Sequence, residues 1–183
     1  IYLWKNRCGG IIKFDWGDFM SLREKLEKLS GECWRNGRVK IKPLLTMDDL
    51  IYATYDCRLT EEQKELVNPA WFSVGRAYLF RDDNYPCIIY NENDKPIGFI
   101  NLNEWLGGGD AHSWSYFIDA EQQGKGYGKA AAQLAIDILK TVDTQKQIKL
   151  ATEECNKKAQ SLYISLGFKK LDELDGDDLV FGL

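Results

Sequence analysis

The chain has 183 residues, a formal net charge of −4 and 44% hydrophobic residues. These values fit one ordinary globular domain with a sizeable core. They exclude a disordered chain and argue against nucleic acid as the main partner. No apolar run is long enough to span a membrane, so we expect no membrane partner.

The cysteines are odd in number and include no Cys-x-x-Cys pair; they are Cys8, Cys33, Cys57, Cys87 and Cys155. This pattern favours reduced thiols in a cytoplasmic protein over a disulfide framework or a zinc site. We therefore expect no metal.

Residues 1–38 predict an N-terminal extension in which no chemistry is legible. Residues 1–4 and 11–14 flank two glycines and predict a hairpin. Ser21 and Glu24 have the spacing of a capping box, which predicts the start of a short helix.

Residues 39–183 predict the main domain, which begins with an edge strand at 39–44. Thr46 and Thr60 then precede two helical segments. The second segment is acidic and carries Glu61, Glu62 and Glu65. These carboxylates indicate either a solvated face or a binding site for a cation.

Two further strands, at 87–90 and 97–102, are joined by a polar turn, and a glycine-rich stretch at 104–110 predicts a mobile loop. The next strand, 113–118, leads toward another glycine-rich stretch. Alternation places four side chains on one face of this strand: His112, Trp114, Tyr116 and Ile118.

Residues 123–129 read Gln-Gly-Lys-Gly-Tyr-Gly-Lys. Glycines at alternate positions let the backbone turn tightly and approach a ligand. The stretch also leads into a helix that starts near Tyr127, where unpaired N–H groups and the helix dipole favour an anion. Lys125 and Lys129 add positive charge. This stretch therefore predicts a cradle for phosphate or pyrophosphate.

Three kinds of cradle can be compared with this one. A P-loop needs a hydroxyl after its lysine, but Ala130 follows Lys129. The dinucleotide fingerprint needs Gly-x-Gly-x-x-Gly, which alternate glycines do not provide. The third pattern, Gln/Arg-x-x-Gly-x-Gly/Ala, is met by Gln123, Gly126 and Gly128. Folds with this pattern bind the pyrophosphate of coenzyme A.

The helix after the cradle is amphipathic as far as Val142, and a strand at 147–152 follows it. A strand, a turn, a helix and a second strand imply a right-handed crossover and locally parallel strands. Asn156 is well placed to cap the next helix, and Gly167 to end it. A hairpin over 169–183 completes the chain.

The spacing Asn156-x-x-Ala159-x-x-x-Tyr163-x-x-x-Gly167-Phe168, one strand after the cradle, resembles the GNAT family of N-acetyltransferases. The resemblance covers about residues 39–183. It implies an α/β (α+β) fold with a mixed, centrally splayed β-sheet flanked by helices. It also implies acetyl-CoA as the co-substrate.

The resemblance implies a role for each matching residue. Backbone N–H groups would hold the pyrophosphate along Gln123, Gly124, Lys125, Gly126, Tyr127, Gly128 and Lys129. Phe117 and Ile118 would pair through their backbone with the pantetheine arm and polarise the thioester carbonyl, and Asn156 and Ala159 would complete the cofactor site. Tyr163 would protonate the leaving thiolate, although alone it would fit a core position.

The proton acceptor is where the sequence departs from the family pattern. Phe117-Ile118-Asp119 before the cradle also resembles bacterial polyamine acetyltransferases, which can carry an acid where this chain has Trp114. The substitutes are His112, whose unperturbed pKa is suitable, and Glu104. A lone histidine is, however, more often structural.

We therefore expect an acetyl-CoA-dependent N-acetyltransferase in which a primary amine attacks directly within a ternary complex. Polyamines, aminoglycosides and protein N-termini are the candidate acceptors. A non-catalytic acyl-CoA sensor or scaffold is the alternative, and a homodimer is compatible with the sequence.

Overall fold

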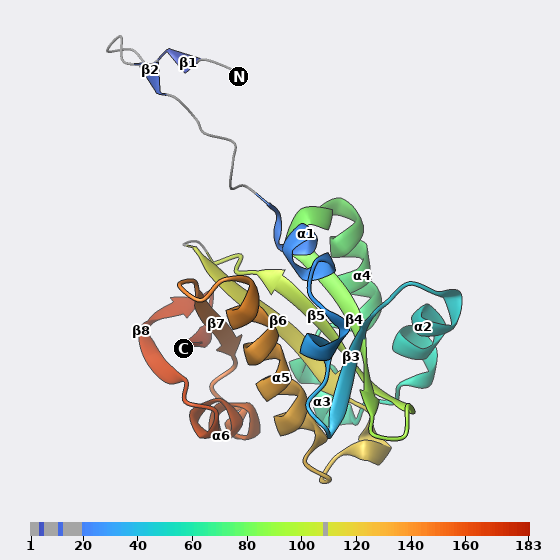
Figure 1. Ribbon diagram of the computed structural model, residues 1–183. Coiled ribbons are helices and arrows are strands. Elements are labelled where there is room, and N and C mark those ends of the chain that lie inside the picture. The colour runs from blue at the N-terminus through green and yellow to red at the C-terminus, as the bar shows by residue number, and fades with distance from the viewer. Residues whose placement is uncertain (1–3, 6–10, 13–19, 108–109) are drawn as a thin grey trace.

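The computed structural model describes residues 4–5, 11–12, 20–107 and 110–183. In this part of the chain seven strands form one sheet (Figure 1). Their spatial order is β3 (Val39–Pro43), β4 (Asn84–Asn91), β5 (Pro96–Glu104), β6 (Ala111–Ile118), β7 (Gln147–Thr152), β9 (Asp178–Gly182) and β8 (Lys169–Asp175). Only β6 and β7 are parallel neighbours, so the sheet is mixed, as predicted.

The sheet is splayed between β6 and β7. The two strands pair at Ala111 with Gln147 and at His112 with Ile148, and beyond these pairs they diverge. The later residues of β7 pair instead with β9. The predicted central splay is therefore confirmed, and its open end lies where β6 runs into the glycine-rich stretch.

Helices cover both faces of the sheet; they are α1 (Leu22–Glu27), α2 (Met47–Ile51), α3 (Glu61–Leu66), α4 (Ala70–Leu79), α5 (Tyr127–Val142) and α6 (Lys157–Ser165). One core joins α1 and α5 to the sheet and includes Leu26, Ile138 and Trp114. A second core, under α4, includes Ala70 and Phe117. Trp114 and Phe117 thus face opposite sides of β6, as the alternation predicts.

The N-terminal segment is described in part. β1 (Trp4–Lys5) and β2 (Ile11–Ile12) pair antiparallel, which confirms the predicted hairpin at these residues. The turn between them lies outside the described residues. The capping box at Ser21 is present, and α1 buries Leu22 and Leu26 in the same core as α5. The boundary at residue 38 stays a prediction.

Sequence patterns did not predict α4. Its small residues Ala70, Ser73 and Ala77 are buried, whereas its large apolar residues Trp71, Tyr78 and Leu79 are exposed. This distribution is the reverse of the usual amphipathic pattern. The helix predicted after Thr46 is confirmed, but its last turn, Tyr52–Asp56, is π-helical. Of the predicted mobile loop, residues 108–109 lie outside the described part.

Three further properties concern only the described residues. No group of three or more His, Cys, Asp or Glu side chains lies close enough together to hold a metal ion. No helix has both the length and the apolar character that crossing a membrane requires. The cysteines Cys33, Cys57, Cys87 and Cys155 are free.

Candidate active site

The splay between β6 and β7 opens into a cleft of about 430 Å³. β6 and β7 form its floor, and α3 and α6 form its walls. The predicted site residues that line it are Phe117, Ile118, Gln123, Asn156, Ala159 and Tyr163. The structure thus brings together residues from both motifs, which lie on either side of the splay.

The glycine-rich stretch forms a loop at the N-terminus of α5. Gly124 and Gly126 have φ values of 73° and 82°, in the left-handed region that glycine adopts most readily. Gly126 is also the N-cap of this 16-residue helix. The first N–H groups of α5 therefore have no carbonyl partner within the helix, and the positive end of its dipole lies at the loop. This geometry fits a pyrophosphate.

Gly128 has a different role from the other two glycines. It lies within the first turn of α5, and its carbonyl oxygen accepts a hydrogen bond of 3.3 Å from the Tyr116 hydroxyl. A Cβ at Gly128 would lie 3.5 Å from that hydroxyl, which is ordinary van der Waals contact. The backbone conformation of the loop therefore depends on Gly124 and Gly126.

The end of β6 is held by contacts that fix its backbone. The Phe117 ring stacks on Phe99 with 5.5 Å between centroids, so the ring is part of the second core. On the neighbouring strand a Cβ at Gly98 would lie only 2.4 Å from the Phe117 carbonyl oxygen. Glycine at position 98 therefore permits this close strand pairing.

Gln63 of α3 is a site residue that sequence reasoning missed. Its amide Nε2 donates to the Ile118 carbonyl oxygen at 3.0 Å, and the Gln123 amide donates to the same oxygen at 3.2 Å. Gln63 also accepts a hydrogen bond from the Thr60 backbone in the capping box of α3. Capping-box spacing is visible in the sequence, but the contact with Ile118 depends on the tertiary fold.

α6 supplies the opposite wall of the cleft. Asn156 is its N-cap, as predicted, and its side-chain oxygen accepts a 3.1 Å hydrogen bond from the Ala159 backbone. Gly167, with φ of 95°, ends the helix as predicted. The Tyr163 ring packs against Phe168 and Phe181, with centroids 5.9 and 5.6 Å away. Burial, together with the charge of Asp178, raises the pKa of Tyr163 to about 12, so its hydroxyl stays protonated.

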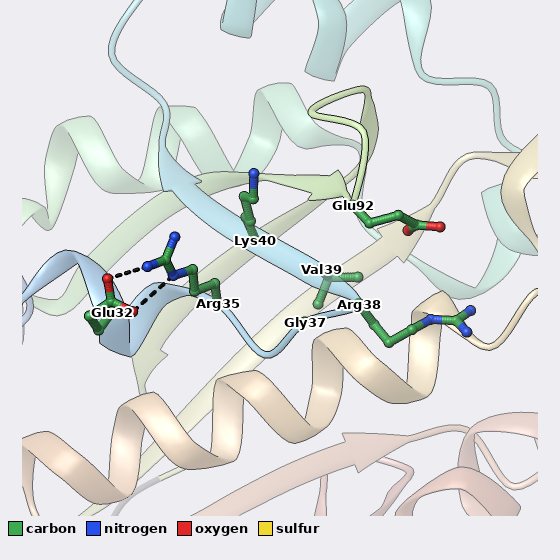
Figure 2. Close-up of a pocket in the computed structure, with 7 residues that line it drawn as sticks. All are labelled: Glu32, Arg35, Gly37, Arg38, Val39, Lys40 and Glu92. Atoms are coloured by element: carbon green, nitrogen blue, oxygen red, sulfur yellow. Dashed lines mark hydrogen bonds and ion pairs between the residues drawn. The ribbon is translucent and has the colours of Figure 1, made fainter.

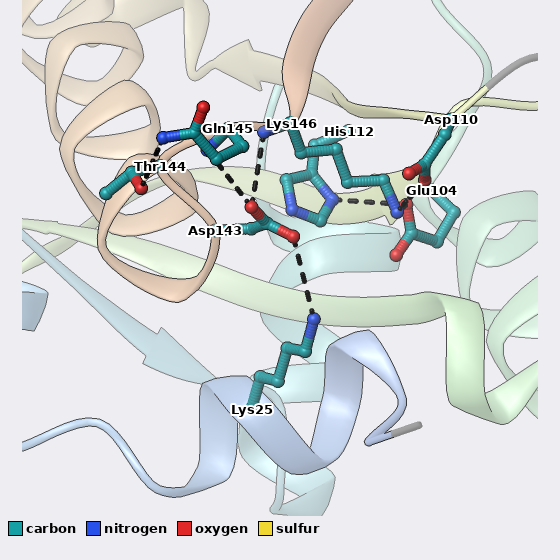
Figure 3. A network of polar contacts seen from close by, with 8 residues as sticks. All are labelled: Lys25, Glu104, Asp110, His112, Asp143, Thr144, Gln145 and Lys146. Carbon is teal, nitrogen blue, oxygen red and sulfur yellow. Dashed lines mark hydrogen bonds and ion pairs between the residues drawn. The ribbon is translucent and has the colours of Figure 1, made fainter. Parts of the chain in front are cut away.

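His112 and Glu104 lie outside this cleft. They form a cross-strand pair at the end of β6 that is still joined to β7, with 3.1 Å between His112 Nδ1 and a Glu104 carboxylate oxygen (Figure 3). Lys146 also contacts Glu104 at 2.8 Å. Burial favours the neutral acid, but hydrogen bonds from His112 and Lys146 outweigh it and lower the pKa of Glu104. The structure therefore does not bring this pair to Tyr163.

Three other carboxylates line the cleft: Glu62, Glu153 and Asp178. Burial and the nearby charges of Glu153, Asp175 and Asp177 raise the pKa of Asp178. Glu62 forms a 2.6 Å ion pair with Lys158, which joins the α3 and α6 walls. Sequence reasoning named Glu62 but missed Asp178. Asp178 begins β9, and the local sequence did not indicate that this strand pairs with β7.

Comparison with known proteins identifies the class of fold and then the family. A structure of an acetyltransferase from Agrobacterium tumefaciens matches with a TM-score of 0.61 at 20% identity, covering 81% of this chain and 92% of that one. RimJ from Mycobacterium smegmatis, in complex with CoA-disulfide, matches with a TM-score of 0.62 at 19% identity, covering 79% and 81%. The chain thus has the fold of acetyltransferases.

The aminoglycoside acetyltransferase AAC(6′)-Ib, in complex with ribostamycin and coenzyme A, is also similar. Its TM-score is 0.62 at 21% identity, covering 79% of this chain and 92% of that one. The model of the GNAT acetyltransferase family matches residues 47–168, and the chain belongs to this family. It is therefore an acetyl-CoA-dependent N-acetyltransferase. No curated protein sequence matches the chain.

Proposed function

We propose that the protein acetylates a primary amine of a small cationic molecule, with a polyamine as the favoured acceptor. The observation that supports this choice is the pair of carboxylates Glu153 and Asp178, which share the cleft with Tyr163 and form no ion pair with another described residue. Carboxylates in a cleft attract cations over several ångströms and concentrate them there. The free cysteines further support a reducing, cytoplasmic location.

Acetyl-CoA supplies the acetyl group as a reactive thioester. In this proposal, backbone N–H groups from Gly124 to Lys129 hold its pyrophosphate at the N-terminus of α5. The backbone of Phe117 and Ile118 aligns the pantetheine arm and polarises the acetyl carbonyl. Asn156 and Ala159 contact the arm from α6. Phe117, Ile118, Asn156 and Ala159 line one cleft with Tyr163, and Gln123, at the start of the glycine-rich stretch, lines it too, which supports a common role.

The proposed reaction needs one proton acceptor and one proton donor. The ammonium group of the acceptor first loses a proton to the Asp178 carboxylate, directly or through a water molecule. The amine nitrogen then bonds to the acetyl carbon as the carbon–sulfur bond breaks. Tyr163 gives its hydroxyl proton to the departing sulfur and regains one from the new amide nitrogen. The products are the amide, the thiol and one proton on Asp178.

The raised pKa of Asp178 supports this role, because a carboxylate with a higher proton affinity is a better acceptor near neutral pH. His112 and Glu104, the acceptors considered from the sequence, belong to a separate polar network with Lys146, in which His112 is buried and Glu104 half-buried. Asp178 therefore replaces them in the proposal.

The acceptor class is tested with a panel of spermidine, spermine, an aminoglycoside and a peptide with a free N-terminus. Release of thiol from acetyl-CoA is measured at low and high ionic strength. We expect the highest kcat/KM for a polyamine, and we expect it to fall with salt because screening weakens attraction to the carboxylates. A higher value for the peptide, or one that is independent of salt, contradicts the proposal.

A matched pair of variants links the result to the cleft. Asp178→Asn should lower kcat/KM for the polyamine and reduce its salt dependence, whereas Asp172→Asn, an exposed position on β8, should change neither. Binding of acetyl-CoA without thiol release for any amine would instead indicate a sensor or scaffold.

A further inference from the structure

Arg38 lies outside both sequence motifs and before the region that matches the family model, yet it contacts the phosphate cradle. Its Nη2 donates a 2.7 Å hydrogen bond to the Lys125 carbonyl oxygen. The guanidinium carbon lies 5.4 Å from the centre of the Tyr127 ring, and Nη2 is 4.0 Å from where a Cβ at Gly126 would be. Arg38 is therefore in contact with the loop from which α5 begins.

Arg38 differs from the other charged residues around it. It lines a hollow of about 470 Å³ together with Arg35, Lys40, Glu32 and Glu92 (Figure 2). Arg35 forms a two-point ion pair with Glu32, which Figure 2 marks with dashed lines. Lys40 forms one with Asp94, with 2.9 Å between the charged atoms. Among the described residues, Arg38 has no carboxylate partner; the contacts it makes are with a carbonyl and a ring.

Neither Arg38 nor Lys125 forms an ion pair with a described carboxylate, although Glu92 lines the same hollow as Arg38 and accepts a hydrogen bond from the Tyr127 hydroxyl. Lys125 donates to the Glu121 carbonyl oxygen and to the Gln122 side chain, both of which are neutral. The Glu121 carboxylate is paired with Arg58. The Arg38 guanidinium therefore lies at the loop where α5 begins and where the positive end of its dipole is, and both favour an anion there.

We propose that Arg38 binds a phosphate group of acetyl-CoA and thereby extends the cradle beyond the family motif. A guanidinium presents several N–H donors in a planar fork, which suits a phosphate better than a single ammonium does. One donor of Arg38 holds the Lys125 carbonyl, and the others are available to the ligand. The inference rests on the proposed position of the pyrophosphate at α5.

The test compares four proteins by isothermal titration calorimetry: wild type, Arg38→Gln, Arg38→Lys and Arg35→Gln. We expect Arg38→Gln to weaken acetyl-CoA binding about tenfold or more, since a charge-assisted hydrogen bond to phosphate is lost. Arg38→Lys should fall between wild type and Arg38→Gln, because it keeps the charge without the fork. Arg35→Gln should bind as wild type does, because Glu32 already pairs with Arg35.

A second ligand, 3′-dephospho-CoA, identifies which phosphate Arg38 binds. If Arg38→Gln weakens coenzyme A and 3′-dephospho-CoA equally, Arg38 binds the pyrophosphate. If the variant weakens coenzyme A alone and abolishes the difference between the two ligands, Arg38 binds the 3′-phosphate. Either result supports the proposal. Affinity for acetyl-CoA within about twofold of wild type in both Arg38 variants would overturn it.

Arg38 could instead act only by holding the loop through its hydrogen bond to the Lys125 carbonyl oxygen, and this structural role is tested separately. Asn36→Ala removes another contact from the same segment, the 2.8 Å hydrogen bond to the Ala130 carbonyl of α5, without changing the charge. We expect this variant to bind acetyl-CoA normally, and we expect Arg38→Gln alone to flatten the dependence of the dissociation constant on salt. An equal loss in both variants with unchanged salt dependence would overturn the proposal. Failure of wild type to bind acetyl-CoA would instead refute the proposed cofactor site.

Discussion

Replacing Tyr163 with Phe tests the proposed proton donor with little disturbance of the fold. The ring contacts with Phe168 and Phe181 remain, because only the hydroxyl is removed. Tyr163 donates no hydrogen bond to another described residue, so its loss leaves no buried partner unsatisfied. We expect the free energy of unfolding to change by no more than about 0.5 kcal/mol.

The expected loss of activity is much larger. With its pKa raised to about 12, Tyr163 is only about one part in ten thousand ionised at pH 8, so nearly every molecule carries the proton. General-acid assistance is worth roughly 100- to 10,000-fold in rate, or about 2.7 to 5.5 kcal/mol of activation free energy. The Tyr163→Phe variant should therefore lose turnover by that factor.

The assay follows thiol release from acetyl-CoA with saturating amine, and calorimetry measures acetyl-CoA binding in parallel. We expect kcat to fall while the dissociation constant stays within about twofold, because in the proposal the hydroxyl transfers protons during the reaction and does not bind acetyl-CoA. If kcat also stays within about twofold, Tyr163 is a core residue of α6 and the proton donor lies elsewhere.

Three further substitutions test other parts of the site. Gly126→Val places a branched side chain at a φ of 82°, which costs roughly 1–2 kcal/mol or more, and calorimetry should show loss of acetyl-CoA binding with an unchanged circular dichroism spectrum. Asp178→Asn should raise the melting temperature at pH 7.5 but not at pH 3.5. The pKa of Asp178 is raised in the folded state, so its contribution to stability is lost as the pH rises through that pKa. An equal change in melting temperature at both pH values would contradict this reasoning. His112→Asn should lower the melting temperature and leave kcat/KM within about threefold, because His112 is 0% exposed and lies outside the cleft; a loss of a hundredfold or more would restore it as a proton acceptor.

Much of the fold could be predicted from local patterns. The glycine-rich turn between a strand and an amphipathic helix predicted the parallel pair β6 and β7, and Thr46 and Thr60 marked two helix starts, where the structure has capping boxes. These features depend on residues that are close together in the sequence, so local patterns predict them. α4 escaped prediction because its small residues face the sheet and its aromatic residues face solvent.

The candidate site, too, could be predicted from local patterns only in part. Motif residues such as Gln123 and Tyr163 line the cleft because the strand and helix patterns that carry them formed as expected. His112 shares a face of β6 with Trp114, but only the tertiary structure shows that β7 still covers the end of the strand where His112 lies. Asp178 and Arg38 reach the site from distant segments, and nothing in their local sequence indicates the contact.

The most direct test of the account is a structure of the protein with coenzyme A and spermidine bound. The account predicts the coenzyme A sulfur within about 3.5 Å of the Tyr163 hydroxyl, in the splay between β6 and β7, with a spermidine amine on the side of Asp178. A pantetheine arm outside the splay, or a sulfur beyond hydrogen-bond reach of Tyr163, would contradict it.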